Sequence, residues 1–483
     1  MRTHCDEIDV APQQSNFPQN STFFTPIHAL TRLSRMVTSF LAKSCPLLLV
    51  AYLGLLSCHL PILGPLLAAD LLAPLIALSL LANRDYRSLV RIPYSPFLAM
   101  LCCLGLVTIS HLPQGGESGY NLAVLAYLFV LFVAFREHPL SRKTMLISGV
   151  AILSAILLGW CYDAFASQCL GINDTGFAFI SPDQVNSNLS FLERRYAFLF
   201  KNPNTLGSFY PLPMALALLG LQPKLKHASK SQWIAILVAI AATLVPLAAT
   251  LSKHAILTQA IVLAFLVHNL PVCSKKVRRF VAIAIFLCSA IVCETTVLFV
   301  TFPLKSTPPF INSTPGMYAI HQVVYAKMPF INARTCLLGQ SPEGIKKTYP
   351  KLADVNSIRK TLEQYGTTKN LEMYATFIDP HNEYLNLAAF YGIPATLLVI
   401  AAFIALAWNQ RKAIYAGAFI AALAVACLWD DLLSKRWIWI TLAILTQRQD
   451  DTDDQAVKTN AGQLDAIPQP TEQECDPNSR GRH

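Results

Sequence analysis

A basic, amide-rich stretch near residue 200 has side chains of the kind that bind anions. It contains Arg194 and Arg195 and ends in an Asn-Pro-Asn sequence whose last residue is Asn204. Arginine binds phosphate oxygens through two parallel N–H groups and stays charged at any physiological pH. Asn-Pro-Asn is a favourable helix start, with Asn204 placed to cap free N–H groups of a helix end that itself favours anions. Loop arginines that reach for a membrane interface would look the same, so the stretch alone leaves both interpretations open.

A second cluster, Asp379-Pro380-His381-Asn382-Glu383, has the residue types of acid–base chemistry. The unperturbed pKa of histidine lies near neutrality, so His381 could accept a proton from a hydroxyl group. Either acidic residue could orient its ring. The same residues are also a good helix start, which is the more common meaning of such a cluster on its own.

A third polar break, Ser252-Lys253-His254, separates two apolar runs. In isolation it indicates a tight turn between two helices. Lys253 could nevertheless add positive charge to an anion site that contains Arg195.

The elements that carry these clusters are expected to be membrane helices. Of the 483 residues, 54% are hydrophobic and only 14% are charged, and the mean hydropathy is +0.44. A soluble domain carries about 25% charged residues, so lipid is the expected solvent for most of the chain. The net charge of +10 does not indicate nucleic-acid binding, because the lysines and arginines fall in short loops between apolar runs, as in cytoplasmic loops.

We predict an all-α polytopic fold with about twelve transmembrane helices. Residues 1–43 are expected to be a disordered cytoplasmic segment, 44–303 to hold nine helices with an outer loop at 163–204, 304–380 to form a large outer loop, 381–446 to hold three helices, and 447–483 to be a disordered cytoplasmic tail. The expected spans include 93–111, 121–135, 144–162, 233–250 and 384–408. Every short basic loop then falls inside, and Arg195, Lys253 and His381 fall at outer helix ends. That shared position, more than any one motif, predicts a site.

Metal and cofactor sites are not expected. No C-x-x-C spacing occurs, and most cysteines lie inside apolar runs, where they act as small packing residues. Cys169 and Cys336 are both expected outside, which leaves a disulfide between them open. The Asp451-Thr452-Asp453 triplet is of a kind that binds metal-nucleotide sugars, but it belongs to the expected cytoplasmic tail and is interpreted as solvated tail.

The clusters resemble those of the O-antigen ligase and polymerase superfamily of bacterial envelopes. Its members have an arginine, then a glycine, then Pro-Asn entering a helix. Here Arg195, Pro203 and Asn204 match. Phe198 stands where glycine is usual. A Ser-Arg pair is common at the next outer turn, where this chain has Lys253 in place of the arginine.

The end of the large outer loop continues the resemblance. The family has a Leu-Gly-x-Gly element, then His-Asn-x-x-Leu, and then a glycine about eleven residues after the histidine. In this chain these are Leu338-Gly339 with Ser341 for the second glycine, His381-Asn382 with Leu385, and Gly392. The resemblance covers roughly residues 120 to 445.

The resemblance implies a GT-C-like fold in the bacterial inner membrane, with a site that faces the periplasm, and makes both outer loops periplasmic. Such enzymes take a glycan from undecaprenyl diphosphate. Ligases place it on a sugar hydroxyl of lipid A core and polymerases on another lipid-linked repeat, without metal or nucleotide. These glycan carriers and membrane lipids are the implied partners, and nucleic acid is not.

The resemblance also implies roles for single residues. Arg195 would hold the donor diphosphate as it leaves, and His381 would be the general base or would orient the acceptor. Lys253 would assist with the anion. Further substrate contacts are expected from Arg194, Asn204 and Asn382. Family ligases use one more basic residue of the large loop, and three candidates stay open for it: His321, Lys327 and Arg334.

Three alternatives stay open. A polymerase would differ from a ligase in its acceptor and not in its architecture. A protein O-oligosaccharyltransferase would be expected to carry a larger soluble C-terminal domain than this short tail. A solute transporter would place ionisable residues near the middle of the membrane, where Asp70 is the clearest carboxylate, and would show internal repeats, which the sequence lacks.

Overall fold

The computed structural model describes ten main segments, at 25–56, 68–83, 95–172, 195–200, 203–225, 228–250, 314–353, 380–410, 416–428 and 433–447. It also describes short pieces at 178–179, 260, 263, 274, 276–277, 280–281, 283–284, 356 and 431. Arg194 and Lys253 and the residues from 448 onward lie outside the described residues.

The first part of the chain is a series of helices with one short ladder. Its elements are α1 (Thr25–Leu55), η2 (Ala68–Leu72), α2 (Ala73–Asn83), α4 (Ser95–His111), η3 (Leu112–Gln114), α5 (Gly116–Glu137), α6 (Arg142–Cys169), β1 (Ala178–Phe179), β2 (Arg195–Tyr196), η6 (Phe198–Phe200), α7 (Pro203–Phe209), α8 (Pro211–Leu225) and α9 (Lys230–Ala249). The η elements are short 3₁₀ helices. Elements of the second part are α12 (Thr314–Lys327), η8 (Met328–Phe330), α13 (Ala333–Leu338), α14 (Pro342–Leu352), α17 (Glu383–Asn409), α18 (Ala416–Ala426) and α19 (Arg436–Leu445).

The expectation of a mainly helical membrane protein is confirmed for the described residues. Five described helices are long and apolar enough to cross a membrane, at Phe97–Gln114, Gly116–Glu137, Arg142–Cys169, Lys230–Leu247 and Glu383–Asn409. Each overlaps one of the spans expected at 93–111, 121–135, 144–162, 233–250 and 384–408. Shorter apolar helices lie at 43–55, 68–82, 205–221 and 436–445.

Two expected boundaries differ from the structure. Helix α1 begins at Thr25, so part of the segment expected to be disordered up to residue 43 is helical. Apolar residues recur through this stretch, among them Met36, Val37 and Phe40, and favour the helix. Helix α6 continues past 162 to Cys169, because the residues after the apolar run contain no helix breaker. Cys169 and Cys336 are both free, so the disulfide left open between them is absent.

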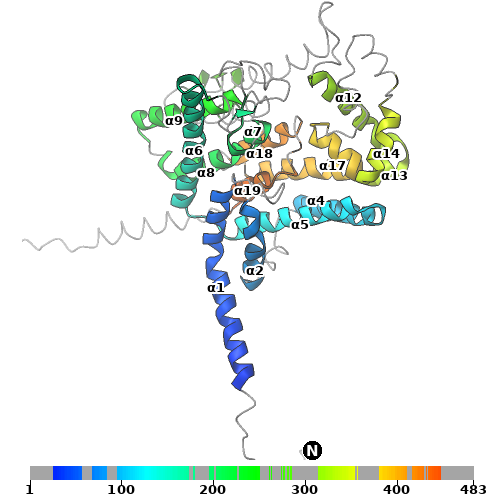
Figure 1. Ribbon diagram of the computed structural model, residues 1–483, viewed down its shortest axis with the longest axis horizontal. Helices are drawn as coiled ribbons and strands as arrows, with labels where there is room; N and C mark the ends of the chain where they lie inside the picture. The colour runs from blue at the N-terminus through cyan, green and yellow to red at the C-terminus, as the bar shows by residue number, and fades with distance from the viewer. Residues whose placement is uncertain are drawn as a thin grey trace, which may run out of the picture.

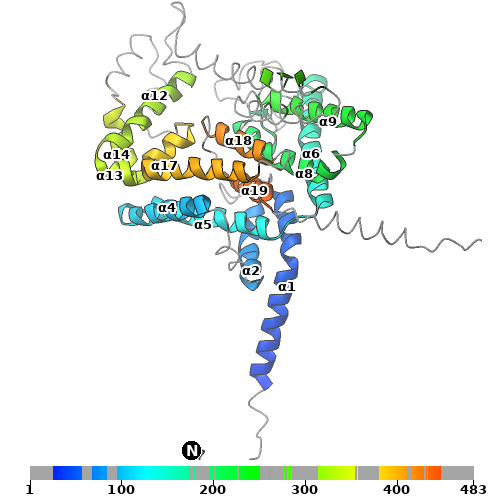
Figure 2. The same cartoon turned by 180° about the vertical axis from the view of Figure 1, so that it is seen from behind.

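The described helices do not form a single parallel bundle. In both views, α4, α5 and α17 lie side by side and run across the direction of α1 and α6 (Figures 1 and 2). Helix α19 lies at the centre, where it packs on α5, α8 and α18. All its residues from Trp437 to Leu445 are buried, and the Trp439 ring packs edge-on against Phe97 and Phe132. This central helix therefore connects the layer of α4, α5 and α17 with the group of α6, α8 and α9.

The described part of the expected large loop is folded into helices. Helix α13 begins at a capping box, in which Asn332 and Thr335 exchange hydrogen bonds, and Ser341 caps α14. The helices α12 and α14 bury a small apolar cluster of their own, which includes Tyr325, Tyr349 and Ala389 of α17. This unit sits on the first turns of α17 (Figure 1). The polar composition of this segment predicts a loop over a helix end but does not indicate its helices.

Two glycines lock this unit onto α17. Gly392 interrupts α17 with a φ of 83°, and a Cβ atom there would lie 2.5 Å from the carbonyl oxygen of Leu337. Gly339 ends α13 with a φ of 66°, and a Cβ atom there would overlap the backbone of Phe390. The N–H of Gln340 donates to the carbonyl oxygen of Ala389 at 2.8 Å. Both glycines thus permit a backbone contact that no other residue would allow.

Candidate functional site

Helix α17 begins at a fully capped turn. The side-chain oxygen of Asn382 accepts from the N–H of Leu385 at 3.0 Å, so Asn382 is the N-cap. Its amide nitrogen donates to the carbonyl oxygen of Leu428 at 3.0 Å. Leu428 belongs to the α18–α19 turn, which is described at residues 427–428, 431 and 433–435. Both ends of the Asn382 amide therefore build the helix start, and its expected substrate contact stays a prediction.

The next two residues also bind the α17 start to α18 and the turn. The buried carboxylate of Glu383 accepts from the N–H of Leu433 at 3.1 Å, and the Glu383 N–H donates to the carbonyl oxygen of Cys427 at 2.8 Å. The Tyr384 hydroxyl donates to the carbonyl oxygen of Ala424 at 2.6 Å. Glu383, expected as one group that could orient His381, is engaged with the α18–α19 turn.

His381 stands just before this capped start with an unusual backbone. Its φ of 48° lies in the left-handed region, where non-glycine residues are uncommon and where they gather at functional sites. The preceding carbonyl, of Pro380, accepts from the Gln322 side chain of α12 at 3.2 Å. The backbone of His381 is thus fixed from both sides, and the residue is half-buried.

His321 of α12 lies beside His381. Its ring is completely buried, and Nδ1 forms a hydrogen bond with the Tyr349 hydroxyl of α14. Burial, and then the positive charge that His381 can carry, lower the pKa of His321 to about 4. The ring is therefore neutral at pH 7. The structure brings His321 to the site as expected, but as a hydrogen-bonding group and not as the cation that the resemblance implies.

The other two basic residues of the loop lie elsewhere. Lys327 and Arg334 are both exposed. Arg334 is close enough to His111, at the end of α4, for their charges to interact. Of the three candidates left open by spacing, His321 is the one that the structure shows in electrostatic contact with His381.

The Arg195 segment lies on the other side of the α18–α19 turn. Arg195 pairs with Phe179 in the two-residue ladder of β1 and β2. The segment is held down by aromatic residues. Phe200 and Phe209 pack edge-on against Trp437 of α19, with ring centroids 5.8 and 5.9 Å away. Two predicted cations are not placed, because Arg194 and Lys253 lie outside the described residues. The same holds for the side chains of Arg195 and Asn204.

Helix α7 begins two residues earlier than an Asn204 cap requires. Its first residue is Pro203, so Asn204 lies inside the first turn. Proline favours the first helical position because its missing N–H would have no partner there. The prediction that Asn204 caps the helix is therefore wrong, although the Asn-Pro-Asn sequence does start a helix.

The departure at Phe198 has a structural reason. Phe198 has a φ of 52°, which is a conformation that favours glycine, the residue usual at this place in the family that the chain resembles. Its ring packs against the position of Gly159 on α6, where a Cβ atom would lie 2.8 Å from it. Gly159 thus leaves the space that the Phe198 ring occupies.

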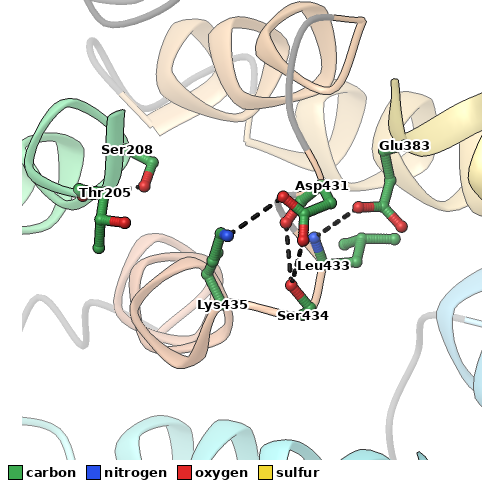
Figure 3. Close-up of polar contacts among 7 residues, drawn as sticks. All are labelled: Thr205, Ser208, Glu383, Asp431, Leu433, Ser434 and Lys435. Carbon is green, nitrogen blue, oxygen red and sulfur yellow. Dashed lines mark hydrogen bonds and ion pairs between the residues drawn. The ribbon is translucent and has the colours of Figure 1, made fainter. Parts of the chain in front are cut away.

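The α18–α19 turn carries charged residues that the sequence analysis missed. The Lys435 ammonium group lies 3.1 Å from an oxygen of Asp431, and the Ser434 hydroxyl donates to the same carboxylate at 3.1 Å (Figure 3). Figure 3 also shows Thr205 and Ser208 of α7 in the same region. In this view the turn lies between α7, which follows the Arg195 segment, and the α17 start, which follows His381. Lys435 and its neighbour Arg436 are basic residues at an expected outer end, the same departure that singled out Arg194 and Arg195, so that signal could have found them.

Asp70, the carboxylate considered for transport, is paired. Both of its oxygens accept from Arg436, and the Tyr127 hydroxyl donates to it at 2.6 Å. The pair lies at the junction of η2, α5 and α19.

The histidines and the lysine described at the site are residue types that can take part in proton transfer and anion binding. Among the described residues, no group of three His, Cys, Asp or Glu side chains gathers to hold a metal ion. Neither a model of a known protein family nor the sequence of a curated protein matches the chain. The function must therefore be argued from the motifs and from the contacts around His381.

Proposed function

We propose that the protein is a glycosyltransferase of the O-antigen ligase type. It takes a glycan from undecaprenyl diphosphate and transfers it to a sugar hydroxyl of lipid A core, at the periplasmic face of a bacterial inner membrane. The observation that carries the proposal is the position of His381. It is fixed in a left-handed conformation beside the neutral His321, and it stands at the helix start that shares the α18–α19 turn with α7.

In the proposed reaction, His381 accepts the proton of the acceptor hydroxyl group. The hydroxyl oxygen bonds to the anomeric carbon of the donor glycan, and the bond from that carbon to the diphosphate oxygen breaks. The diphosphate leaves with the electron pair. A general base of this kind contributes about 10²–10⁴-fold to a rate.

Neutral His321 suits this role for His381. A second cation next to His381 would oppose its protonation, whereas a neutral ring does not. The hydrogen bond between Tyr349 and Nδ1 holds the His321 ring in place. Arg195 would hold the departing diphosphate, and Lys435 adds a cation at the turn that both segments share. Positioning and charge neutralisation are the main demands on the protein, because the diphosphate is already near its final charge.

Transfer by the purified protein in lipid nanodiscs tests the proposal. The donor is a glycan on undecaprenyl diphosphate and the acceptor is lipid A core. We expect His381→Asn to lower the transfer rate by about 10²–10⁴-fold, while asparagine tolerates the left-handed backbone. His138→Asn, at the end of α5, is the matched control and should keep the wild-type rate. Normal transfer by His381→Asn would refute the assignment.

Deletion of the gene in its host separates ligase from polymerase. A ligase defect leaves core lipid without long glycan, while undecaprenyl-linked polymer accumulates. A polymerase defect instead yields core with a single repeat. Unchanged lipopolysaccharide would refute the proposed function.

A further inference from the structure

An apolar cavity of about 230 Å³ lies between α6, α8 and α9. Apolar side chains make up most of its wall. Thr243, one of its two hydroxyl residues, donates to the carbonyl oxygen of Ile240 on its own helix at 2.7 Å. The three helices stand together at the end of the molecule opposite the α12–α14 unit (Figure 1). Such a mainly apolar wall offers a ligand few hydrogen bonds and suits a hydrocarbon chain.

Close packing of α6 on α8 makes the back of the cavity. A Cβ atom on Gly149 would lie 2.5 Å from the backbone nitrogen of Ala217, and one on Gly220 would lie 2.6 Å from that of Leu146. Glycine at both positions lets the two backbones meet, as small residues do between membrane helices. Because α6 and α8 leave no space between each other, the cavity lies between these two helices and α9.

Small side chains keep the cavity open toward the lipid. Ser154 and Ala239 line it and are exposed, and Val150 at its edge is 47% exposed. The lining of α8 runs from Met214 to Leu221, which is a helical rise of about 10 Å. A chain could therefore enter sideways from the membrane and lie along the helices.

One end of the cavity lies next to the Arg195 segment. The Tyr196 hydroxyl donates to the carbonyl oxygen of Ile156 at 2.8 Å, and Ile156 is the neighbour of the lining residue Leu157. On the α9 side, the Tyr210 hydroxyl donates to the carbonyl oxygen of Thr243. The segment that follows Arg195 thus rests on the same turns that end the cavity.

We propose that this cavity holds the polyprenyl chain of the donor, next to the diphosphate site. The inference rests on the proposed function, since it places the tail of the same donor. The described segment at the end of the cavity begins at Arg195, so a lipid whose anionic head lies there can lay its tail in the cavity. A diphosphate carries more charge than the single phosphate of an ordinary phospholipid, which selects the donor over bulk lipid.

A larger side chain in the cavity should weaken the binding of long-chain donors and should not change the binding of short-chain donors. We expect Ala239→Trp to raise the KM for an undecaprenyl-linked donor on the order of tenfold, the loss that follows when a few buried methylene groups are displaced. The KM for a donor on a single prenyl unit, which is too short to reach Ala239, should not change. The matched control is Ala241→Trp, which changes an exposed alanine on the same helix that does not line the cavity. Ser154→Phe, with Ala155→Phe as its control, repeats the test on α6.

Equal effects of Ala239→Trp and Ala241→Trp, or equal effects on long and short donors, would overturn the inference. A photoreactive undecaprenyl diphosphate without glycan tests the cavity independently of transfer. It should label α6, α8 or α9 peptides, and excess undecaprenyl diphosphate should suppress the label. Equal suppression by phosphatidylglycerol would show an ordinary lipid and would overturn it. A wild-type protein that labels in this way but transfers nothing from either donor would refute the proposed function and support the cavity.

Discussion

The buried ring of His321 lies within electrostatic reach of His381, although the two residues come from different helices. His321 is held on α12 by Tyr349, and His381 is held by the capped start of α17. Burial keeps the His321 ring of this pair neutral at pH 7. The lowered pKa of His321 makes the packing of α12 and α14 on α17 depend on pH.

Acidification should loosen α12 and α14 from α17. The pKa of His321 falls from its ordinary 6.5 to about 4 in the folded protein. Between these values the opened state binds the proton and the packed state does not, so packing is fully stable above pH 6.5 and weakens as the pH falls toward 4. Hydrogen exchange of peptides from residues 314–353, corrected for intrinsic rates, measures this. His321→Asn should remove the dependence, and an equally steep dependence in that variant would contradict the assignment.

Alanine at either interlocking glycine should separate the loop unit from α17. A Cβ atom at Gly339 or Gly392 meets backbone, which cannot yield, and their backbone conformation, with positive φ and ψ near 180°, alone costs a non-glycine residue about 1–3 kcal/mol. We expect Gly339→Ala and Gly392→Ala each to lower the thermal stability in detergent and to reduce transfer. Gly105→Ala in α4 is the control, because nothing lies within 4 Å of its added methyl group and alanine favours the helix. An equally large loss of thermal stability in Gly105→Ala would contradict the role of Gly339 and Gly392 in the contact between the loop unit and α17.

Replacement of Phe198 by glycine should lower the melting temperature less than replacement by alanine. Its ring is 7% exposed, and removal of a buried phenylalanine ring costs about 3–5 kcal/mol. Glycine recovers about 1–2 kcal/mol of that by relieving the left-handed backbone, and alanine does not. The expected order of melting temperatures is wild type, then Phe198→Gly, then Phe198→Ala. The reverse order of the two variants would show that the backbone conformation carries no cost.

Local patterns predicted those parts of the molecule that depend on neighbours in the sequence. Five expected apolar spans coincide with long helices, and the polar cluster at Asn382 does cap a helix. The Asn-Pro-Asn sequence starts α7, although Asn204 lies inside its first turn and not at the expected cap position. Hydrophobic periodicity and capping act over a few residues, so one sequence contains them.

Contacts between distant residues were not predictable in this way. Nothing near Gly339 indicates that it meets Phe390, and nothing near Glu383 indicates Leu433. His321 was reached by spacing, but its burial depends on Tyr349 and the helices around it. Tertiary packing also decided that this ring is neutral, which no residue type could reveal.

Loss of either Asp70 or Arg436 alone should destabilise the protein, whereas replacement of both by apolar residues should not. Arg436 donates to both oxygens of Asp70, Tyr127 donates to Asp70 at 2.6 Å, and the hydroxyl groups of Tyr127 and Tyr52 lie 2.5 Å apart. Removal of one partner leaves a charge in an apolar setting, which costs about 3–5 kcal/mol, whereas an apolar pair of similar volume is often neutral. We therefore expect Asp70→Leu or Arg436→Met alone to abolish monodisperse protein in size-exclusion chromatography, and the double variant to restore it. Glu117→Gln, which breaks an exposed pair with Lys346, should have little effect. A double variant no better than either single one would mean that the network does more than hold α19 against η2 and α5.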